Sequence, residues 1–306
     1  MIGRVVEIAE DGRHLALSRG FMVVKADGAE LGRVPLDDVG VLLVNAHGTT
    51  YSNNLMVALA ERGAGVVLCG ANHSPVAWLW PLAGHHVQMA RMKAQLEAGR
   101  PLCKRLWQAV VRAKIEMQGS VLEVLGRDSV GFRLMARQVA SGDPDNLEAQ
   151  AARRYWPLMM GPDFRRDREA GGANALLNYG YTVLRSATAR AIVATGLHPS
   201  VGVHHRNRND AMVLADDLME PFRPLVDLMV VRLVEHGATD VTPEAKRSLA
   251  GLLSVDMRTA QGRTPLGTCL ERLAVSVAQS FEGNDSKLDL PLAPLPLEMP
   301  LPQSKG

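Results

Sequence analysis

The chain has 306 residues, of which 47% are hydrophobic, and its formal net charge is only +2. This length allows two domains of ordinary size, and the hydrophobic fraction predicts that most of the chain is globular. The near-neutral charge excludes a chain that is basic throughout, so a surface for nucleic acid must be a local patch. Three dispersed cysteines without a CxxC pair argue against a disulfide framework and a structural zinc site.

The sequence has no sign of a membrane or secretory segment. The N-terminus lacks a basic start followed by an apolar run, and no uncharged apolar stretch is long enough to span a bilayer. The apolar run 225–234 is interrupted by Asp227 and Arg232. Together with the sparse cysteines, this predicts a soluble cytoplasmic protein with no membrane role.

Short strands broken by turns dominate residues 1–75. Asp11-Gly12 and Asp27-Gly28 are hairpin signals, while 39–45 and 65–69 are continuous apolar runs that favour buried strands. The expected strands are 4–8, 14–18, 21–25, 39–45 and 65–69, with one short helix over 55–62. This pattern predicts a small β-rich N-terminal domain.

Helical spacing replaces the strand pattern after an expected linker over residues 76–84. The expected helices cover 85–98, 102–125, 129–140, 147–160, 174–195, 211–236, 243–257 and 266–281. We find no strand signal beyond the linker, so residues 85–282 are predicted to form an all-α domain. The fold class is therefore α+β, a small N-terminal β-rich domain followed by a larger all-α C-terminal domain.

The last residues, 283–306, have a different composition. Leu alternates with Pro from 288 to 302, which favours extended polyproline II and opposes packing. We expect a disordered tail, with a docking peptide as the alternative.

Three acids close to one another suggest a charged site. Asp216 and Asp217 precede Glu220 by four and three positions, spacings that place carboxylates on one helical face. Such acids repel one another unless a metal ion or nearby arginines offset the charge. The arginines available in the sequence are Arg206, Arg208 and Arg223. The alternative is a solvated acidic helix face.

A histidine and a further acid extend this group. His205 lies in a polar loop fifteen positions before Glu220, and Glu148 lies in the first turn of its expected helix. Two Glu and one His suit a divalent metal on oxygen-rich ligands. The alternatives are an ordinary surface histidine and an acid that only complements the helix dipole. His204 is open: it supports a ligand, contacts DNA or is structural.

The segment 150–210 is locally basic. Nine Lys or Arg stand against four acids there, a net charge of +5. A basic surface in a near-neutral chain suggests contacts with phosphates.

Four segments together carry a family resemblance: 148–156, 174–181, 202–205 and 217–224. Over roughly residues 1–282 the chain resembles the CRISPR-associated integrases of spacer acquisition, the first-numbered Cas protein, and is most similar to their type II branch. The motif order, the His-to-Glu interval and the β-then-α organisation all agree with this family.

The resemblance implies an activity and an assembly. Such proteins pair through their β domains into homodimers, and two dimers bind a central dimer of the second-numbered Cas protein as a heterohexamer. The complex inserts a double-stranded DNA prespacer into the CRISPR array when a 3′-OH attacks a phosphodiester of the repeat. The chain is thus expected to be a metal-dependent DNA integrase and endonuclease. The alternative is a non-catalytic binder of branched DNA or of a protein partner.

The resemblance also implies roles for individual residues. Glu148, His205 and Glu220 are the expected catalytic residues and the ligands of Mg²⁺ or Mn²⁺, and Asp217 and His204 are expected to support them. The arginines expected to contact the DNA backbone are Arg153, Arg154, Arg165, Arg166 and Arg208. The segment 163–172 is Arg-rich but lacks the proline that the family leads us to expect, which weakens the arginine roles.

Overall fold

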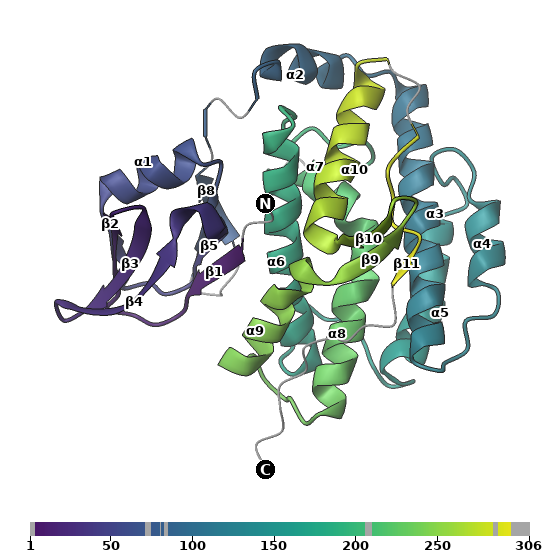
Figure 1. The fold of residues 1–306 in the computed structure, drawn as a ribbon. Helices are drawn as coiled ribbons and strands as arrows, with labels where there is room; N and C mark the ends of the chain where they lie inside the picture. The colour runs from purple at the N-terminus through teal and green to yellow at the C-terminus, as the bar shows by residue number, and fades with distance from the viewer. Residues whose placement is uncertain are drawn as a thin grey trace.

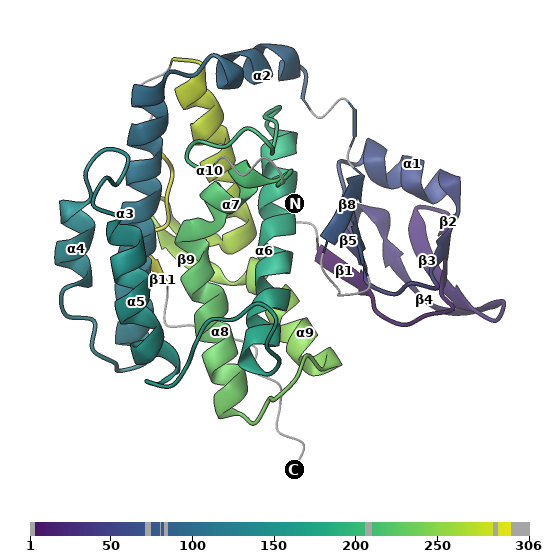
Figure 2. The ribbon, with the colours of Figure 1, turned by 180° about the vertical axis from the view of Figure 1, so that it is seen from behind.

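The computed structural model describes residues 4–70, 75–79, 81–82, 85–205, 210–283 and 287–294. A β-rich N-terminal part is followed by a larger, mostly helical part, and the two lie side by side in both views (Figures 1 and 2). This arrangement confirms the predicted α+β class. No helix among the described residues is both long and apolar enough to cross a bilayer.

The N-terminal part contains two four-stranded sheets, ordered β1-β5-β7-β8 and β4-β3-β2-β6. Its elements are β1 Arg4–Ile8, β2 His14–Ser18, β3 Phe21–Ala26, β4 Ala29–Pro35, η1 Leu36–Asp38, β5 Val39–Val44, β6 Thr50–Tyr51, α1 Asn53–Glu61, β7 Gly65–Cys69 and β8 Pro75–Leu79. All six residues of β5 are buried, as its unbroken apolar run predicts.

Only one of the two expected turn signals makes a hairpin. Asp27 and Gly28 both have positive φ and join β3 to β4, as a tight hairpin turn requires. Asp11-Gly12 does not join paired strands, because β1 pairs with β5 in one sheet and β2 pairs with β3 in the other. That expectation was wrong.

The first sheet extends into the expected linker. β8 pairs antiparallel with β7, with Val67 opposite Trp78, so residues 76–79 are part of the sheet. Trp78 lies directly over Gly65, where a Cβ atom would come within 2.5 Å of the indole nitrogen. A continuous linker over 76–84 is therefore wrong.

The helical part is built around α6, which lies between the β-rich part and the other helices (Figures 1 and 2). Gly180 lets α6 approach α8 closely, because a Cβ atom there would come within 2.4 Å of Val226. The elements are α2 Gln88–Leu96, α3 Arg100–Val124, α4 Phe132–Gln138, α5 Leu147–Met160, α6 Ala173–Ala194, α7 Val213–Met219, η2 Glu220–Phe222, α8 Arg223–Glu235, α9 Pro243–Gly251, η3 Leu252–Ser254 and α10 Leu266–Phe281.

A small sheet interrupts the helices, so the C-terminal part is mostly helical rather than all-α. β9 (Asp256–Thr259) and β10 (Gly262–Pro265) form an antiparallel hairpin, and β11 (Ala293–Pro294) pairs with the other edge of β9. The expected helix over 243–257 ends at Gly251, and burial then alternates along β9 as in a strand, with Met257 buried and Arg258 exposed.

Part of the expected disordered tail is packed. Leu288 is only 7% exposed, and the backbone N–H of Asp289 donates to Ser276 Oγ of α10. The N–H of Leu292 donates to the carbonyl of Arg258 before β11 begins. Residues 287–294 are thus ordered, while 295–306 lie outside the described residues.

Polar contacts join the two parts beside the apolar packing of Tyr179 on the first sheet. Glu7 of β1 accepts a hydrogen bond of 2.8 Å from the Tyr179 hydroxyl of α6. Its other oxygen lies 2.8 Å from Lys246 Nζ of α9. Arg190 of α6 donates to the carbonyl of Gly63 at 3.3 Å.

Candidate functional site

The start of α5 places Glu148. Asp143 accepts the backbone N–H groups of Leu147 and Glu148 at 2.9 and 3.0 Å, and Asn146 accepts that of Ala149. Asp143 and Asn146 both have positive φ, which Asp and Asn tolerate better than most residues. The tight turn and the caps fix the first turn of the helix, where Glu148 lies.

A break between α7 and α8 places Glu220. The expected continuous helix over 211–236 is wrong, because a 3-10 turn over 220–222 separates two α-helices. Pro221 has no N–H to continue the helical hydrogen bonds, which favours this tighter turn. Glu220 is 5% exposed and its side chain enters the core beside α3.

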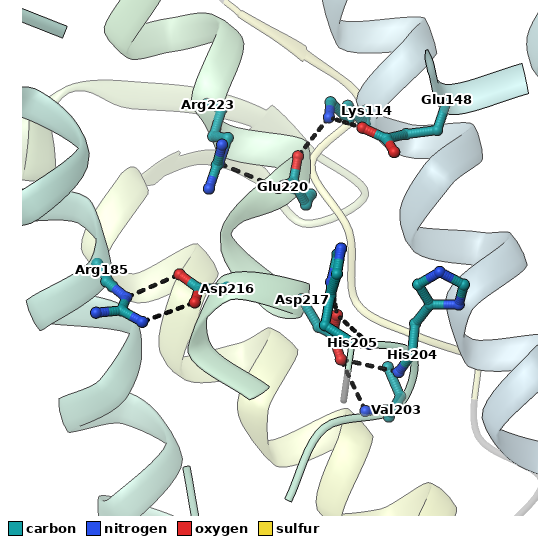
Figure 3. A network of polar contacts seen from close by, with 10 residues as sticks. All are labelled: Lys114, Glu148, Arg185, Val203, His204, His205, Asp216, Asp217, Glu220 and Arg223. Atoms are coloured by element: carbon teal, nitrogen blue, oxygen red, sulfur yellow. Dashed lines mark hydrogen bonds and ion pairs between the residues drawn. The ribbon is translucent and has the colours of Figure 1, made fainter. Parts of the chain in front are cut away.

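The three acids of this segment have different partners. Asp216 faces α6, where Arg185 donates to both of its oxygens at 2.8 and 2.7 Å. Figure 3 shows this pair apart from Glu220, so the expectation that Asp216 and Glu220 share one face is wrong. The repulsion among these acids is offset mainly by Arg185, Lys114 and Arg223, of which only Arg223 was expected from the sequence.

Asp217 organises the loop that carries the histidines. It is fully buried and accepts the backbone N–H groups of Val203, His204 and His205 at 2.8, 2.9 and 3.3 Å. Its Oδ1 atom also lies 2.5 Å from His205 Nδ1. Gly202 is needed before this loop, because a Cβ atom there would lie 2.9 Å from Asp217 Oδ2.

Lys114 joins the two glutamates. Its Nζ atom pairs with Glu148 and lies 2.5 Å from Glu220 Oε2, while Arg223 Nε lies 3.1 Å from the other oxygen of Glu220 (Figure 3). Glu148 and Glu220 follow Lys114 by 34 and 106 positions in the sequence, yet they meet at its ammonium group. The ring of His205 points to the side where Glu220 and Lys114 lie (Figure 3).

The charges of this cluster act on one another. Burial raises the pKa of Glu220, but Arg223 and Lys114 outweigh burial and hold that pKa below its ordinary value. Burial lowers the pKa of Lys114, but Glu220 and Glu148 outweigh it and the net pKa is raised. The hydrogen bond to Asp217 raises the pKa of His205, and Glu220 and Glu148 add to the rise. These shifts favour the carboxylate form of Glu220 and the ammonium form of Lys114.

His204 is placed differently from His205. Its ring stacks on Trp107 of α3, with centroids 4.1 Å apart and an angle of 4° between the planes. Burial lowers the pKa of His204, and His205 lowers it further. His204 thus holds the loop against α3 as a neutral aromatic ring, which lies to the side of the His205 ring (Figure 3).

A second carboxylate network lies behind the site. Asp227 of α8 is 2% exposed and accepts hydrogen bonds from the hydroxyls of Tyr155 and Tyr181. Burial raises the pKa of Asp227 to about 6. Arg223 lies over the ring of Tyr181, 4.9 Å from its centroid, and so connects this network to Glu220.

The side chains of Glu148, Glu220 and His205 suit a divalent cation, although their polar atoms are engaged by other residues of the protein. Among the described residues, no group of three or more His, Cys, Asp or Glu is arranged to hold a metal ion. Two carboxylates nevertheless converge on one cation, the ammonium of Lys114. Glu220 Oε2 is buried and makes this ion pair without a well-directed hydrogen bond. With Nδ1 of His205 held by Asp217, the remaining ring nitrogen and the carboxylates form a set that suits Mg²⁺ or Mn²⁺.

Comparison with known proteins identifies the family. The family model of CRISPR associated protein Cas1 matches residues 6–260. The chain belongs to the Cas1 family. The CRISPR-associated endonuclease Cas1 of Neisseria meningitidis serogroup C (strain 8013) is 35% identical over 289 residues, covering 93% of this chain and 94% of that protein. These matches confirm the family to which the four sequence segments point.

Solved structures share the fold of this Cas1-family chain. A casposase bound to an integration product matches with a TM-score of 0.79 at 19% identity, covering 94% of this chain and 92% of that one. A Cas6-RT-Cas1–Cas2 complex matches with a TM-score of 0.73 at 18% identity, covering 94% of this chain and 36% of that one. At these identities the two likenesses concern the fold.

The five arginines expected to contact DNA differ in their surroundings in this Cas1-family chain. Arg153 is exposed on α5, and Arg154 reaches Asp128 at 3.5 Å. Arg165 donates to carbonyls of its own loop. Arg166 is bound by the side chains of Asn174 and Asn178 and lies over Tyr181, so it ties its loop to α6. Arg208 lies outside the described residues.

Lys114 is the main site residue that was not expected from the sequence. It lies on the buried, mostly apolar stripe of α3 with Val110, Met117, Gln118 and Val121. A lysine in the middle of such a stripe is a signal in itself, because a buried charge needs an opposite charge. Its partners could not be read from the spacing, because they lie on two other elements.

Proposed function

We propose that the chain is a metal-dependent DNA endonuclease and integrase of CRISPR adaptation. The observation that carries the proposal is the convergence of Glu148 and Glu220 on one cation, beside a histidine that Asp217 orients. The names of the curated relatives and the integration product held by the casposase support the same reaction class.

Glu148, Glu220 and the free ring nitrogen of His205 would hold the Mg²⁺ or Mn²⁺ ion. When bound, such an ion supplies positive charge that stabilises a phosphodiester as negative charge develops on its oxygens. Asp217 keeps the Nδ1 proton of His205 in place, so that the lone pair of the other nitrogen faces the ion. Arg223 offsets the remaining charge of Glu220.

The reaction is a phosphoryl transfer. In integration, a 3′-OH of a prespacer attacks a phosphodiester of the repeat, and the oxygen of the cut strand leaves with the proton. With water as the nucleophile the same transfer nicks DNA. No covalent bond to the protein is needed.

The partners follow from the same proposal. Arg153, Arg154 and Arg165 bind phosphates of double-stranded DNA without reading its sequence, so binding weakens as salt rises. The chain pairs through its β-rich part into a homodimer and joins Cas2 in a heterohexamer. The solved complex that contains both Cas1 and Cas2 supports the partnership with Cas2.

The test is strand transfer into a supercoiled plasmid that carries a repeat, with Cas2 and Mn²⁺ added. Glu148→Gln and His205→Ala should abolish both transfer and nicking and leave DNA binding within a few-fold of the wild type. The matched control is Glu123→Gln, which removes a glutamate on α3 that pairs with the exposed Arg133. It should keep full activity.

A non-catalytic binder of branched DNA or of a partner is the second candidate. The observation that favours it is that Lys114 and Arg223 already offset the charges of both glutamates. If Glu148→Gln and His205→Ala lose DNA binding as fast as activity, or if the wild type neither nicks nor joins DNA with any divalent ion, this second reading replaces the first.

A further inference from the structure

The ammonium of Lys114 lies where two carboxylates of the proposed metal site meet. Its side chain is 10% exposed and pairs with Glu148 and Glu220, whose side chains are 26% and 7% exposed. Burying a lysine is costly, because its charge loses the stabilisation that water provides. A hydrophobic residue would suit the apolar stripe of α3 better, unless the charge itself has a use.

The charges around this point balance without a metal. Lys114 and Arg223 together offset Glu148 and Glu220, so the four side chains sum to zero. If Lys114 were neutral, the same group would carry a net charge of −1. A divalent cation therefore meets two carboxylates whose charge is already offset, and it must either displace the ammonium or bind against its charge.

We propose that Lys114 is an internal counter-ion, which holds Glu148 and Glu220 together in the metal-free protein and competes with the divalent cation for them. This inference rests on the metal site of the proposed function. Lys114 is then a positioning residue: it keeps two distant carboxylates converged until the ion arrives, and it lowers the affinity for that ion. The opposing possibility is that Lys114 only orients the carboxylates and so strengthens metal binding.

The two possibilities predict opposite changes in Mn²⁺ affinity when the charge of Lys114 is removed. Lys114→Met keeps the length of the side chain and removes its charge. If the ammonium competes, Mn²⁺ should bind the variant about tenfold tighter or more, because a positive charge next to the ion has been removed. The metal-free variant should unfold at a lower temperature than the wild type, because Glu148 and Glu220 lose their counter-ion. The rise in Tm on adding Mn²⁺ should be larger than in the wild type.

The experiment titrates Mn²⁺ into the full-length chain without DNA, by calorimetry and by the Mn²⁺ electron paramagnetic resonance signal, and records Tm with and without the ion. Lys114→Gln removes the charge but keeps an N–H donor for a carboxylate, and it should shift affinity in the same direction if Lys114→Met fails to fold. Lys104→Met is the matched control, because Lys104 is exposed ten positions earlier on the same helix. It should bind Mn²⁺ like the wild type.

Equal or weaker Mn²⁺ binding by both Lys114 variants, in a wild type that processes DNA, overturns the counter-ion inference alone. Absence of Mn²⁺ and Mg²⁺ binding in the wild type and in both variants overturns this inference and the metal site of the proposed function together. Tighter binding by the variants, with Lys104→Met unchanged, supports the inference even before any activity is measured.

Discussion

Oδ1 of Asp217 lies 2.5 Å from Nδ1 of His205, and the same carboxylate accepts the backbone N–H groups of residues 203–205. One buried side chain therefore sets both the path of the loop and the orientation of the imidazole that the loop carries. In a metal site, such a carboxylate behind a histidine fixes which ring nitrogen faces the metal.

Replacing Asp217 should damage the reaction more than the binding of DNA. Asp217→Asn keeps the size of the side chain but has only one acceptor oxygen for several donors, so His205 loses its orientation. We expect activity in strand transfer to fall about 10- to 100-fold, with the Kd for DNA nearly unchanged. Asp216→Asn is the control, because Asp216 pairs with Arg185 away from His205. Equal losses in the two variants would contradict the role of Asp217.

Gly202 should not tolerate a methyl group. A Cβ atom there would lie 2.8 Å from the carbonyl oxygen of His205 and 2.9 Å from Asp217 Oδ2, so the loop must shift. Gly202→Ala should lower the free energy of unfolding by about 1–3 kcal/mol and reduce strand transfer. The measurement is urea denaturation together with the activity assay. Gly171→Ala serves as the control, because nothing lies within 4 Å of its Cβ position. A fully active, stable Gly202→Ala would contradict the described packing.

The stability of the chain should depend on pH through Asp227. Burial raises its pKa from 3.8 to about 6 in the folded protein, so folding favours the protonated form. The stabilisation from this group is complete below pH 3.8 and is lost as pH rises through 6. Relative to Asp227→Asn, which does not titrate, the wild type should lose at most about 3 kcal/mol between pH 4 and pH 7.

Urea denaturation of both proteins at a series of pH values checks this expectation. The difference between the two free energies of unfolding isolates Asp227, because the other carboxylates are common to both chains. A difference that does not change across this range would mean that the carboxyl group has an ordinary pKa in the folded state.

The packed start of the C-terminal segment should contribute to stability. Leu288 is 7% exposed and Leu292 is 57% exposed, although both belong to the same Leu-Pro pattern. Leu288→Ala should cost about 2–4 kcal/mol of the free energy of unfolding, and Leu292→Ala less than about 1 kcal/mol. Thermal or urea denaturation of the two variants decides this, and equal effects would contradict the packing of residues 287–290.

Much of the fold could be predicted because its signals are local. The apolar run Val39–Val44 predicts its own strand, and the Asp27-Gly28 pair predicts its own turn. The helical spacing of apolar residues along α3 likewise predicts that helix. The hairpin of β9 and β10 was missed because four-residue strands are too short to show a clear period. The strand β11 was missed because its pairing depends on β9, about 35 positions earlier.

The site was harder to predict from residues alone. Spacing suggested the acids around Glu220, but the family resemblance was needed to select Glu148 and His205. Asp216 was grouped with Glu220 by spacing, whereas its partner Arg185 comes from another helix. Lys114 was missed for the same reason: helical periodicity tells which side chains face inward, but it does not tell which of them meet.

The stacking of Trp107 on His204 makes the histidine loop visible to spectroscopy. The indole is 1% exposed and lies almost parallel to the imidazole, with the ring of His205 at its edge. A protonated imidazole quenches the emission of a neighbouring indole much more strongly than a neutral one. A change in the protonation of these imidazoles, or release of the loop, should therefore change the fluorescence of Trp107, and the wild-type chain carries its own optical reporter without any attached dye.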